Sequence, residues 1–112
     1  MSALFDQVSR RFREGHMGKP PELFSDQRLD DVTQFRPAAV LAALTDRAGE
    51  PGILLLHRPS TMRSHPGQIA LPGGGIDPGE TPVEAALRET WEELGIHERD
   101  VQVIGTSDVY RT

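Results

Sequence analysis

Apolar positions along the chain change their spacing several times, and each spacing predicts a different kind of element. Near the N-terminus, apolar residues recur at helical spacing and predict a short amphipathic helix over residues 3–13: Leu4, Phe5, Val8 and Phe12. Glycines and prolines between Gly15 and Pro21 end that pattern and begin a polar stretch that reaches about Arg36.

The middle of the chain predicts three short strands. The apolar run from Pro37 to Thr45 is continuous. Its alanines leave a helix open, but the proline before it and the turn residues 46–49 after it favour a buried strand. Ile53–His57 predicts a second strand, which forms a hairpin with the first through that turn. Gln68–Leu71 predicts a third strand, which leads into a proline and three glycines at 72–75.

Thr81–Leu94 carries signals for both ends of a helix. Thr81 is a good N-cap, Pro82 suits the first helical position, and Glu84 completes a capping box. Gly95 supplies the stop. One stripe, with Ala86 beside it, is expected to face the core: Val83, Leu87, Thr90 and Leu94. After this helix, Val101–Ile104 and Ser107–Tyr110 predict further strand.

Composition narrows the classes of protein that this pattern can build. The chain has 112 residues, enough for one small domain, and 37% of them are apolar, as in globular proteins. Cysteine is absent, no apolar run approaches the roughly 20 residues that span a bilayer, and the N-terminus lacks a signal peptide. We therefore expect a cytoplasmic protein that does not engage a membrane.

The formal net charge of −5 argues against a nucleic-acid partner, because such proteins need an excess of Lys and Arg to displace counterions. The same charge opposes binding of polyanionic phosphates. An enzyme that acts on phosphates would need a local cluster of basic residues or a bound cation.

Three glutamates on the predicted helix suggest such a cation. Glu89, Glu92 and Glu93 lie at i, i+3 and i+4, so they share one face. Like charges at this spacing destabilise a helix by roughly 0.2–0.5 kcal/mol per pair, and the last helical turn disfavours negative charge. A hard divalent cation with oxygen ligands would reverse that penalty. A solvated acidic face is the alternative interpretation of the three residues alone.

The glycines before the helix allow close approach of backbone to a ligand, although a plain structural turn remains open. Gly-Lys-Ser/Thr is missing, so the loop is not a P-loop. Pro78 occupies the position where a dinucleotide fingerprint that starts at Gly73 needs glycine or alanine.

Together the loop and the helix resemble the Nudix box, G-x5-E-x7-R-E-U-x-E-E-x-G-U. The matching residues are Gly74, Glu80 and the run from Arg88 to Ile96. Thr90 is the one departure, because the pattern asks there for a bulky aliphatic residue; the threonine is expected to loosen packing under the helix without touching a metal ligand.

This resemblance implies a metal-dependent hydrolase of diphosphate linkages. Glu89, Glu92 and Glu93 would bind Mg²⁺ or Mn²⁺, and the Gly73 carbonyl would add a ligand. Arg88 would orient a neighbouring carboxylate, and Glu80 would fix the loop against the helix. The implied fold is an α/β/α sandwich of the α/β class with a mixed sheet.

A second motif lies upstream, where Leu54–Arg58, Arg63, Gly67 and Pro72–Gly74 resemble the additional signature of Nudix coenzyme A pyrophosphatases. Leu56, Pro59 and Leu71 depart from it. Four basic or potentially basic groups fall within nine residues: His57, Arg58, Arg63 and His65. Arginine suits bidentate contacts to phosphate.

The resemblance assigns substrate binding to Arg58, Arg63, His65 and Gly67, and implies cleavage of coenzyme A or its thioesters into 3′,5′-ADP and 4′-phosphopantetheine or its acyl form. Ordinary loop charges, and substrates such as ADP-ribose, NADH or other nucleoside diphosphate derivatives, stay open.

The expected organisation is an N-terminal helix and extension over residues 1–35 and a partial Nudix hydrolase domain over residues 36–112. The chain ends one predicted strand after the acidic helix, so we expect a C-terminally truncated sandwich. A non-catalytic Nudix-like binding module therefore stays an alternative. The expected partner is a small nucleotide of the coenzyme A class, and a homodimer is compatible with these expectations.

Overall fold

The computed structural model describes residues 2–18, 34–58, 61 and 67–109. It divides into two compact units, one of Met1–Arg36 with Val103–Thr112 and one of Pro37–Gln102. No helix in the described parts of the chain is both long and apolar enough to cross a membrane.

The first unit contains helix α1, Ala3–Met17, which is longer than the expected 3–13. Ser2 caps it, because its Oγ accepts a hydrogen bond from the Phe5 N–H at 3.1 Å. The helix runs through Gly15 and ends at Gly18. The Phe12 ring packs against Gly105, where an added Cβ would lie 2.5 Å from the ring. A short stretch of the C-terminal segment therefore covers part of the apolar face of α1.

The second unit consists of six short strands followed by helix α2, Pro82–Leu94, and a 3₁₀ turn. Its six strands are β1 Ala38–Val40, β2 Leu44–Arg47, β3 Glu50–Ile53, β4 Leu56–His57, β5 Ile69–Ala70 and β6 Gly73–Gly75. They pair as β1–β6, β2–β3 and β4–β5, each antiparallel. Among the described residues no parallel pair occurs, so the parallel part of the expected mixed sheet is not present there.

We expected a single strand over the apolar run 37–45, but the structure divides this run between two strands, β1 and β2. The break at residues 41–43 is the place where the run changes partner. Leu41 N–H donates to the Pro72 carbonyl at 2.8 Å, beside β6, whereas the Ala43 carbonyl accepts from Leu54 N–H at 2.9 Å, beside β3. The second predicted strand, 53–57, is divided in the same way between β3 and β4. The hairpin itself is confirmed.

The β2–β3 hairpin turns at Ala48 and Gly49, whose φ angles are 52° and 79°. Two consecutive positive φ angles are typical of the two-residue turn whose twist matches that of paired strands. Gly49 adopts this conformation readily, whereas Ala48 is an alanine held in the left-handed region.

The prediction of strands at 101–104 and 107–110 is wrong for the described residues, because residues 101–109 form no strand. The β-branched residues there favour extended backbone, but a strand also needs a neighbour to accept its hydrogen bonds. In the parts that the structure describes, this segment finds none. Tyr110 lies outside the described residues.

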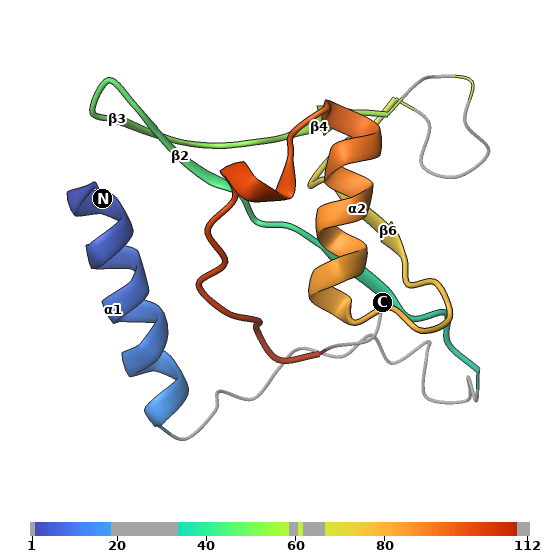
Figure 1. Cartoon of the computed structure of the whole chain (residues 1–112), viewed down its shortest axis with the longest axis horizontal. Helices are drawn as coiled ribbons and strands as arrows, with labels where there is room; N and C mark the ends of the chain where they lie inside the picture. Colours follow the sequence, from blue (N-terminus) through green and yellow to red (C-terminus); the bar gives the residue numbers. More distant parts are fainter. Residues whose placement is uncertain (1, 19–33, 59–60, 62–66, 110–112) are drawn as a thin grey trace. The chain divides into compact units, whose positions relative to one another are not determined.

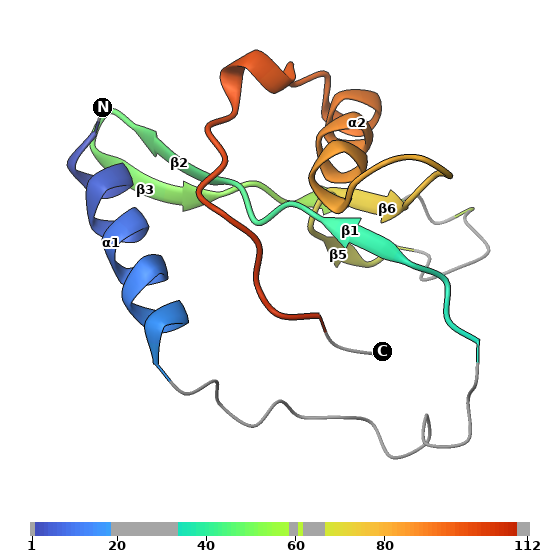
Figure 2. The ribbon, with the colours of Figure 1, turned by 60° about the horizontal axis from the view of Figure 1, so that its bottom comes forward.

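Helix α2, Pro82–Leu94, is confirmed with the predicted ends. Thr81 Oγ1 accepts from Glu84 N–H at 3.1 Å, and Glu84 Oε1 accepts from Thr81 N–H at 2.9 Å. Gly95 ends the helix in the left-handed conformation and donates to the Trp91 carbonyl at 2.9 Å. Figures 1 and 2 show α2 lying across β1 and β6.

The packing face of α2 agrees with the predicted stripe only at Thr90 and at Ala86 beside it. Its buried residues are Ala85, Ala86 and Thr90, whereas Leu94 is 36% exposed and Val83 and Leu87 are half-buried. The reason lies in β6, which is three glycines: a strand without side chains lets the helix approach closely enough for small residues to fill the contact. Thr90 is 1% exposed, and its hydroxyl donates to the Ala86 carbonyl at 2.7 Å.

Candidate active site

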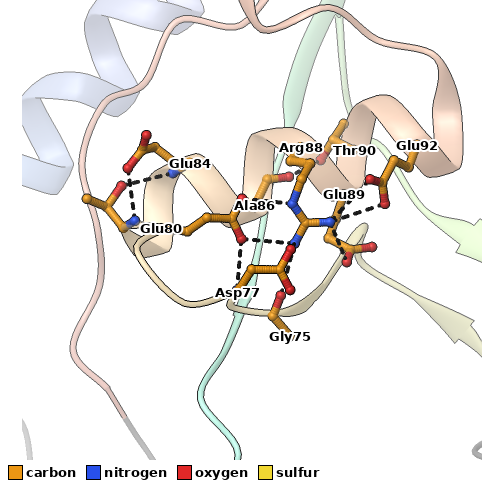
Figure 3. Close-up of polar contacts among 10 residues, drawn as sticks. Gly75, Asp77, Glu80, Glu84, Ala86, Arg88, Glu89, Thr90 and Glu92 are labelled. Atoms are coloured by element: carbon orange, nitrogen blue, oxygen red, sulfur yellow. Dashed lines mark hydrogen bonds and ion pairs between the residues drawn. The ribbon is translucent and has the colours of Figure 1, made fainter.

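Arg88 joins helix α2 to the loop that precedes it. Its Nε donates to Glu80 Oε2 at 2.7 Å, and its Nη2 donates to Glu80 Oε1 at 3.0 Å. Nη2 also donates to the Gly75 carbonyl at 3.1 Å and lies 3.4 Å from Asp77 Oδ2. Figure 3 shows these groups converging on one guanidinium. Arg88 and Glu80 thereby hold the 75–80 loop against the helix.

The remaining nitrogen of Arg88 faces two of the three glutamates on α2. Nη1 donates to Glu89 Oε1 at 3.1 Å and to the two oxygens of Glu92 at 3.2 and 3.3 Å (Figure 3). The Glu89 side chain is 22% exposed and that of Glu92 is 54% exposed. Both carboxylates therefore remain open to solvent beside a fixed positive charge.

Hydrogen bonds between Arg88 and Glu80 shift the pKa of both groups. The pKa of Glu80 is lowered, first by the hydrogen bond from Arg88 and then by the one from the Asp77 N–H. The pKa of Arg88 is raised, first by its hydrogen bond to Glu80, with those to Glu89 and Glu92 adding to the effect. Both groups are thus held in their charged forms at neutral pH.

Two glutamates of α2 contact the glycines of β6. Glu93 Oε1 accepts a hydrogen bond from the Gly73 N–H at 2.9 Å. The Glu89 carboxylate lies beside Gly74, where an added Cβ would be 2.8 Å from its Cδ and Oε1. The space that a side chain would fill at Gly74 is therefore taken by a carboxylate, which explains why this position of the loop needs glycine.

The glutamates share one helix, but they are not gathered as one set of ligands. Within the described parts of the chain, no three acidic or imidazole side chains come together closely enough to hold a metal ion. Glu89 and Glu92 turn toward Arg88, whereas Glu93 turns toward Gly73. The three carboxylates repel one another, and the guanidinium of Arg88 attracts only the two on its own side. The assignment of Glu89, Glu92 and Glu93 as metal ligands therefore stays a prediction.

The donor groups nevertheless fit a divalent cation in their chemistry. Carboxylate oxygens and a backbone carbonyl are the ligands that Mg²⁺ and Mn²⁺ prefer. Glu89, Glu92 and Glu93 leave oxygens accessible at least in part, and the glycine backbone beside them places no side chain in the way.

Only part of the predicted substrate-binding segment lies within the described residues. Arg58 N–H donates to the Gln68 carbonyl at 2.8 Å, and Gly67 N–H donates to the Arg58 carbonyl at 3.1 Å. These bonds extend the β4–β5 pairing, so Arg58 and Gly67 close the base of the loop between them. Arg63 and His65 lie outside the described residues. Two residues, Leu71 and Pro72, separate β5 from β6. The glycines of β6 contact Glu89 and Glu93.

Asp77 and the carbonyl of Gly75 were not predicted as site groups. Asp77 makes contacts through its backbone and through its side chain. Its N–H donates to Glu80 Oε1 at 2.9 Å, and its carboxylate pairs with Arg88. The Asp-Pro-Gly composition at 77–79 predicts a turn. A turn at these residues directs the chain back toward the helix and brings Asp77 close to Arg88. The Asp-Pro-Gly composition was therefore the signal in the sequence that could have identified Asp77 as a site residue.

An aromatic pair joins Trp91 of α2 to His97, which follows the helix. The rings of Trp91 and His97 have centroids 4.2 Å apart and an interplanar angle of 32°. The two residues line an open depression of about 510 Å³ with the half-buried Leu87 and with charged residues: Glu80, Glu84, Arg88 and Glu98. The pair connects the last turns of α2 to the 3₁₀ helix η2, Glu98–Asp100.

Comparison with known proteins gives consistent matches over this region. The family model of the NUDIX domain matches residues 35–112. Nudix hydrolase 3 of Caenorhabditis elegans is 40% identical over 87 residues, and an uncharacterized Nudix hydrolase NudL of an Enterobacter species is 49% identical over 85 residues. The matches cover 78% and 75% of this chain but 34% and 44% of those relatives, so the chain spans less than half of their length.

Solved structures also resemble this chain in fold. The crystal structure of the Caenorhabditis elegans Ap4A hydrolase superposes with a TM-score of 0.50 and 35% sequence identity, covering 59% of this chain and 46% of that one. The expected α/β architecture is confirmed by this likeness and by the family match.

Proposed function

Because this chain belongs to the NUDIX domain family, we propose that it is a metal-dependent hydrolase that cleaves a diphosphate linkage in a nucleotide derivative of the coenzyme A class. The observation that carries the proposal is the contact between α2 and β6: one helix presents Glu89, Glu92 and Glu93, and the glycines beside them approach two of these carboxylates. Arg88 and Glu80 hold the connecting loop in place.

Glu89, Glu92 and Glu93 would hold Mg²⁺ or Mn²⁺, with the Gly73 carbonyl as a further ligand. A bound divalent cation supplies charge neutralisation of the diphosphate, polarisation of a P–O bond and activation of water. The chain's own contribution is positional. Gly73 N–H orients Glu93, and Arg88 orients the other two glutamates.

The substrate class rests on the basic segment between β4 and β5. Coenzyme A carries a 3′-phosphate besides its diphosphate, and this segment brings two arginines and two histidines within nine residues, shortly before the glycines of β6. Arg58 and Gly67 are joined at the base of this loop, so Arg63 and His65 lie between two fixed ends. The products would be 3′,5′-ADP and 4′-phosphopantetheine or its acyl form.

Hydrolysis assays with Mg²⁺ or Mn²⁺ test the proposal on coenzyme A, dephospho-coenzyme A, ADP-ribose and NADH. We expect Glu92→Gln and Glu93→Gln to lower kcat with little change in KM, because these residues act chiefly on the transition state. Arg99→Gln, an exposed substitution in η2, is the matched control and should leave both constants unchanged. Absence of cleavage by a folded chain that binds metal would favour a non-catalytic binding module.

Arg63→Ala tests the substrate class separately. It should raise KM for coenzyme A more than for dephospho-coenzyme A, with a loss of roughly tenfold or more in kcat/KM, because charge-assisted contacts to phosphate contribute about 1.5–3 kcal/mol. Equal losses on both substrates would remove the support for coenzyme A and leave diphosphate hydrolysis standing.

Ap4A is the second candidate substrate, because the solved relative is an Ap4A hydrolase. A kcat/KM for Ap4A above that for coenzyme A would decide for it.

A further inference from the structure

One face of α2 bears an aromatic ring that the described part of the structure covers only in part. Leu87 and Trp91 lie one turn apart, on a different face from the buried Ala86 and Thr90. Trp91 remains 47% exposed although the imidazole of His97 lies against its ring. Tryptophan is enriched where proteins bind partners, because its ring buries a large apolar area and carries a polar N–H. This face is therefore a candidate interaction surface.

The depression beside this ring carries more negative than positive charge. Its charged lining residues are three glutamates and one arginine: Glu80, Glu84, Glu98 and Arg88. The guanidinium of Arg88 is paired with Glu80 and with carboxylates outside the depression (Figure 3). Glu84 accepts from the Thr81 N–H, whereas the exposed Glu98 has no ion pair with any residue that the structure describes. An anionic ligand such as a nucleotide would be repelled here, and a cation would be attracted.

An exposed indole ring next to a carboxylate favours one chemical class of ligand. A cation above an indole face is attracted by the quadrupole of the ring, and a carboxylate nearby pairs with the same charge. A guanidinium suits both contacts, because it is flat, stacks on aromatic rings and donates several hydrogen bonds in its plane. Leu87 offers an apolar surface to the methylene stem of such a side chain. The lining therefore matches an arginine side chain in shape and in charge.

We propose that this depression binds an arginine side chain of a partner polypeptide, with the guanidinium on the Trp91 ring and Glu98 as its counter-charge. A polypeptide is favoured over a free small cation because the depression is open. Sites for small ligands enclose most of the ligand surface, whereas a polypeptide gains further contacts outside the depression. This inference goes beyond the proposed hydrolysis and does not depend on it.

Nitrogen-15 NMR titrations of the whole chain with short peptides test the proposal. The probe is the peptide Gly-Ser-Arg-Leu-Ser-Gly, blocked at both ends, and its control carries citrulline, a neutral side chain of nearly the same shape as arginine. The arginine peptide should shift the indole N–H signal of Trp91 and the backbone signal of Glu98, with a Kd lower than that of the citrulline peptide by about threefold or more. Equal binding of the two peptides, or the same shifts with AMP, would overturn the proposal. So would N-acetylarginine amide binding as tightly as the peptide, because the site would then belong to small cations.

Variants of the chain test the two contacts separately. Trp91→Leu keeps an apolar side chain but removes the aromatic face, and should weaken binding of the arginine peptide by about threefold or more. Glu98→Gln should weaken it as well. Asp100→Asn is the matched control, because it removes an exposed carboxylate from the same 3₁₀ helix outside the lining, and should leave the Kd unchanged.

Equal effects of Glu98→Gln and Asp100→Asn would overturn the proposal, since general attraction to an acidic chain predicts that result. Sedimentation of the free chain supplies a further check, because a dimer that Trp91→Leu dissociates would show that a second copy occupies this face. If Trp91→Leu fails to fold, the citrulline comparison and the Glu98→Gln variant still decide. None of these measurements reads hydrolysis, so the two proposals can fail separately.

Discussion

Gly73 and Gly74 are adjacent in β6 but have different neighbours. A substitution at one of them is therefore expected to affect stability, and a substitution at the other to affect metal binding. An added Cβ at Gly73 would meet backbone atoms of β1, namely the Ala39 carbonyl oxygen and Val40 Cα. At Gly74 its three nearest neighbours would all be atoms of the Glu89 carboxylate, the first of them at 2.8 Å. Backbone cannot move aside without disturbing the β1–β6 pairing, whereas the end of a glutamate side chain can.

We therefore expect Gly73→Ala to destabilise the chain by about 1–3 kcal/mol, the range for forced overpacking. Gly74→Ala should leave the free energy of unfolding nearly unchanged and weaken Mn²⁺ binding, because it displaces the Glu89 carboxylate. Urea denaturation and a metal titration on both variants check this. Equal destabilisation by the two substitutions would contradict the contacts that the structure assigns to them.

Glu80 makes stability depend on pH. Its pKa is lowered in the folded chain, mainly by the hydrogen bond from Arg88, so its contribution to stability is present above the unfolded pKa and is lost as pH falls through the folded one. Glu80→Gln should destabilise the chain at pH 7 and flatten the acid side of a plot of Tm against pH. The two curves should approach each other toward pH 3.

Melts of both forms from pH 7 to pH 3 check this difference. In an Arg88→Gln background, the same substitution at position 80 should have a smaller effect, because the main partner that lowers the pKa of Glu80 is gone and only the Asp77 N–H remains. A constant difference between the two curves across the whole range would contradict the assignment.

At the scale of elements, the sequence predicts the ends of α2 correctly because helix-capping signals are local. Thr81, Glu84 and Gly95 each act within four residues of their partners, so their identities suffice. Strand limits depend on partners far along the chain. The break at 41–43 reflects Pro72 and Leu54, which no property of the run itself reveals. The same lack of a partner explains why residues 101–109 form no strand despite their β-branched composition.

The capping box of α2 gives a prediction for the helix as a whole. Thr81→Ala removes the oxygen that accepts from the Glu84 N–H, and should destabilise the chain by about 1 kcal/mol in urea denaturation. Glu84→Gln is the matched control, because glutamine can also accept from the Thr81 N–H, and it should have a smaller effect. A larger effect of the glutamine substitution would show that charge at the helix N-terminus outweighs the cap.

The site was predicted in its residues but not in its arrangement. Spacing along a helix shows that Glu89, Glu92 and Glu93 share a face, and this is independent of side-chain torsions. Which way each carboxylate turns depends on Arg88 and on the Gly73 N–H, which compete for them in three dimensions. Asp77 joins the network through a turn whose direction the sequence does not specify.

Acidic charge across the whole molecule makes the stability sensitive to divalent metal. The net charge is −5, and three acidic groups lie on α2 where a dication would relieve repulsion. Millimolar Mg²⁺ or Mn²⁺ should therefore raise Tm, with about 2.7 kcal/mol of stabilisation at a concentration 100 times the Kd. Thermal melts with KCl at equal ionic strength correct for general screening. A Glu92→Gln, Glu93→Gln double variant should lose the rise, and no shift in the wild-type chain would count against an intact metal site.

Trp91 is the only tryptophan in the chain, and its ring lies against His97, just beyond the end of α2. Indole fluorescence therefore comes from a single known place, and an imidazole in contact with the ring quenches it. Unwinding of the last helical turn would separate the two rings, so we expect it to brighten the emission. The chain thus carries a built-in optical reporter on the helix that holds the glutamates, so fraying of that helix can be followed in real time without attaching a dye.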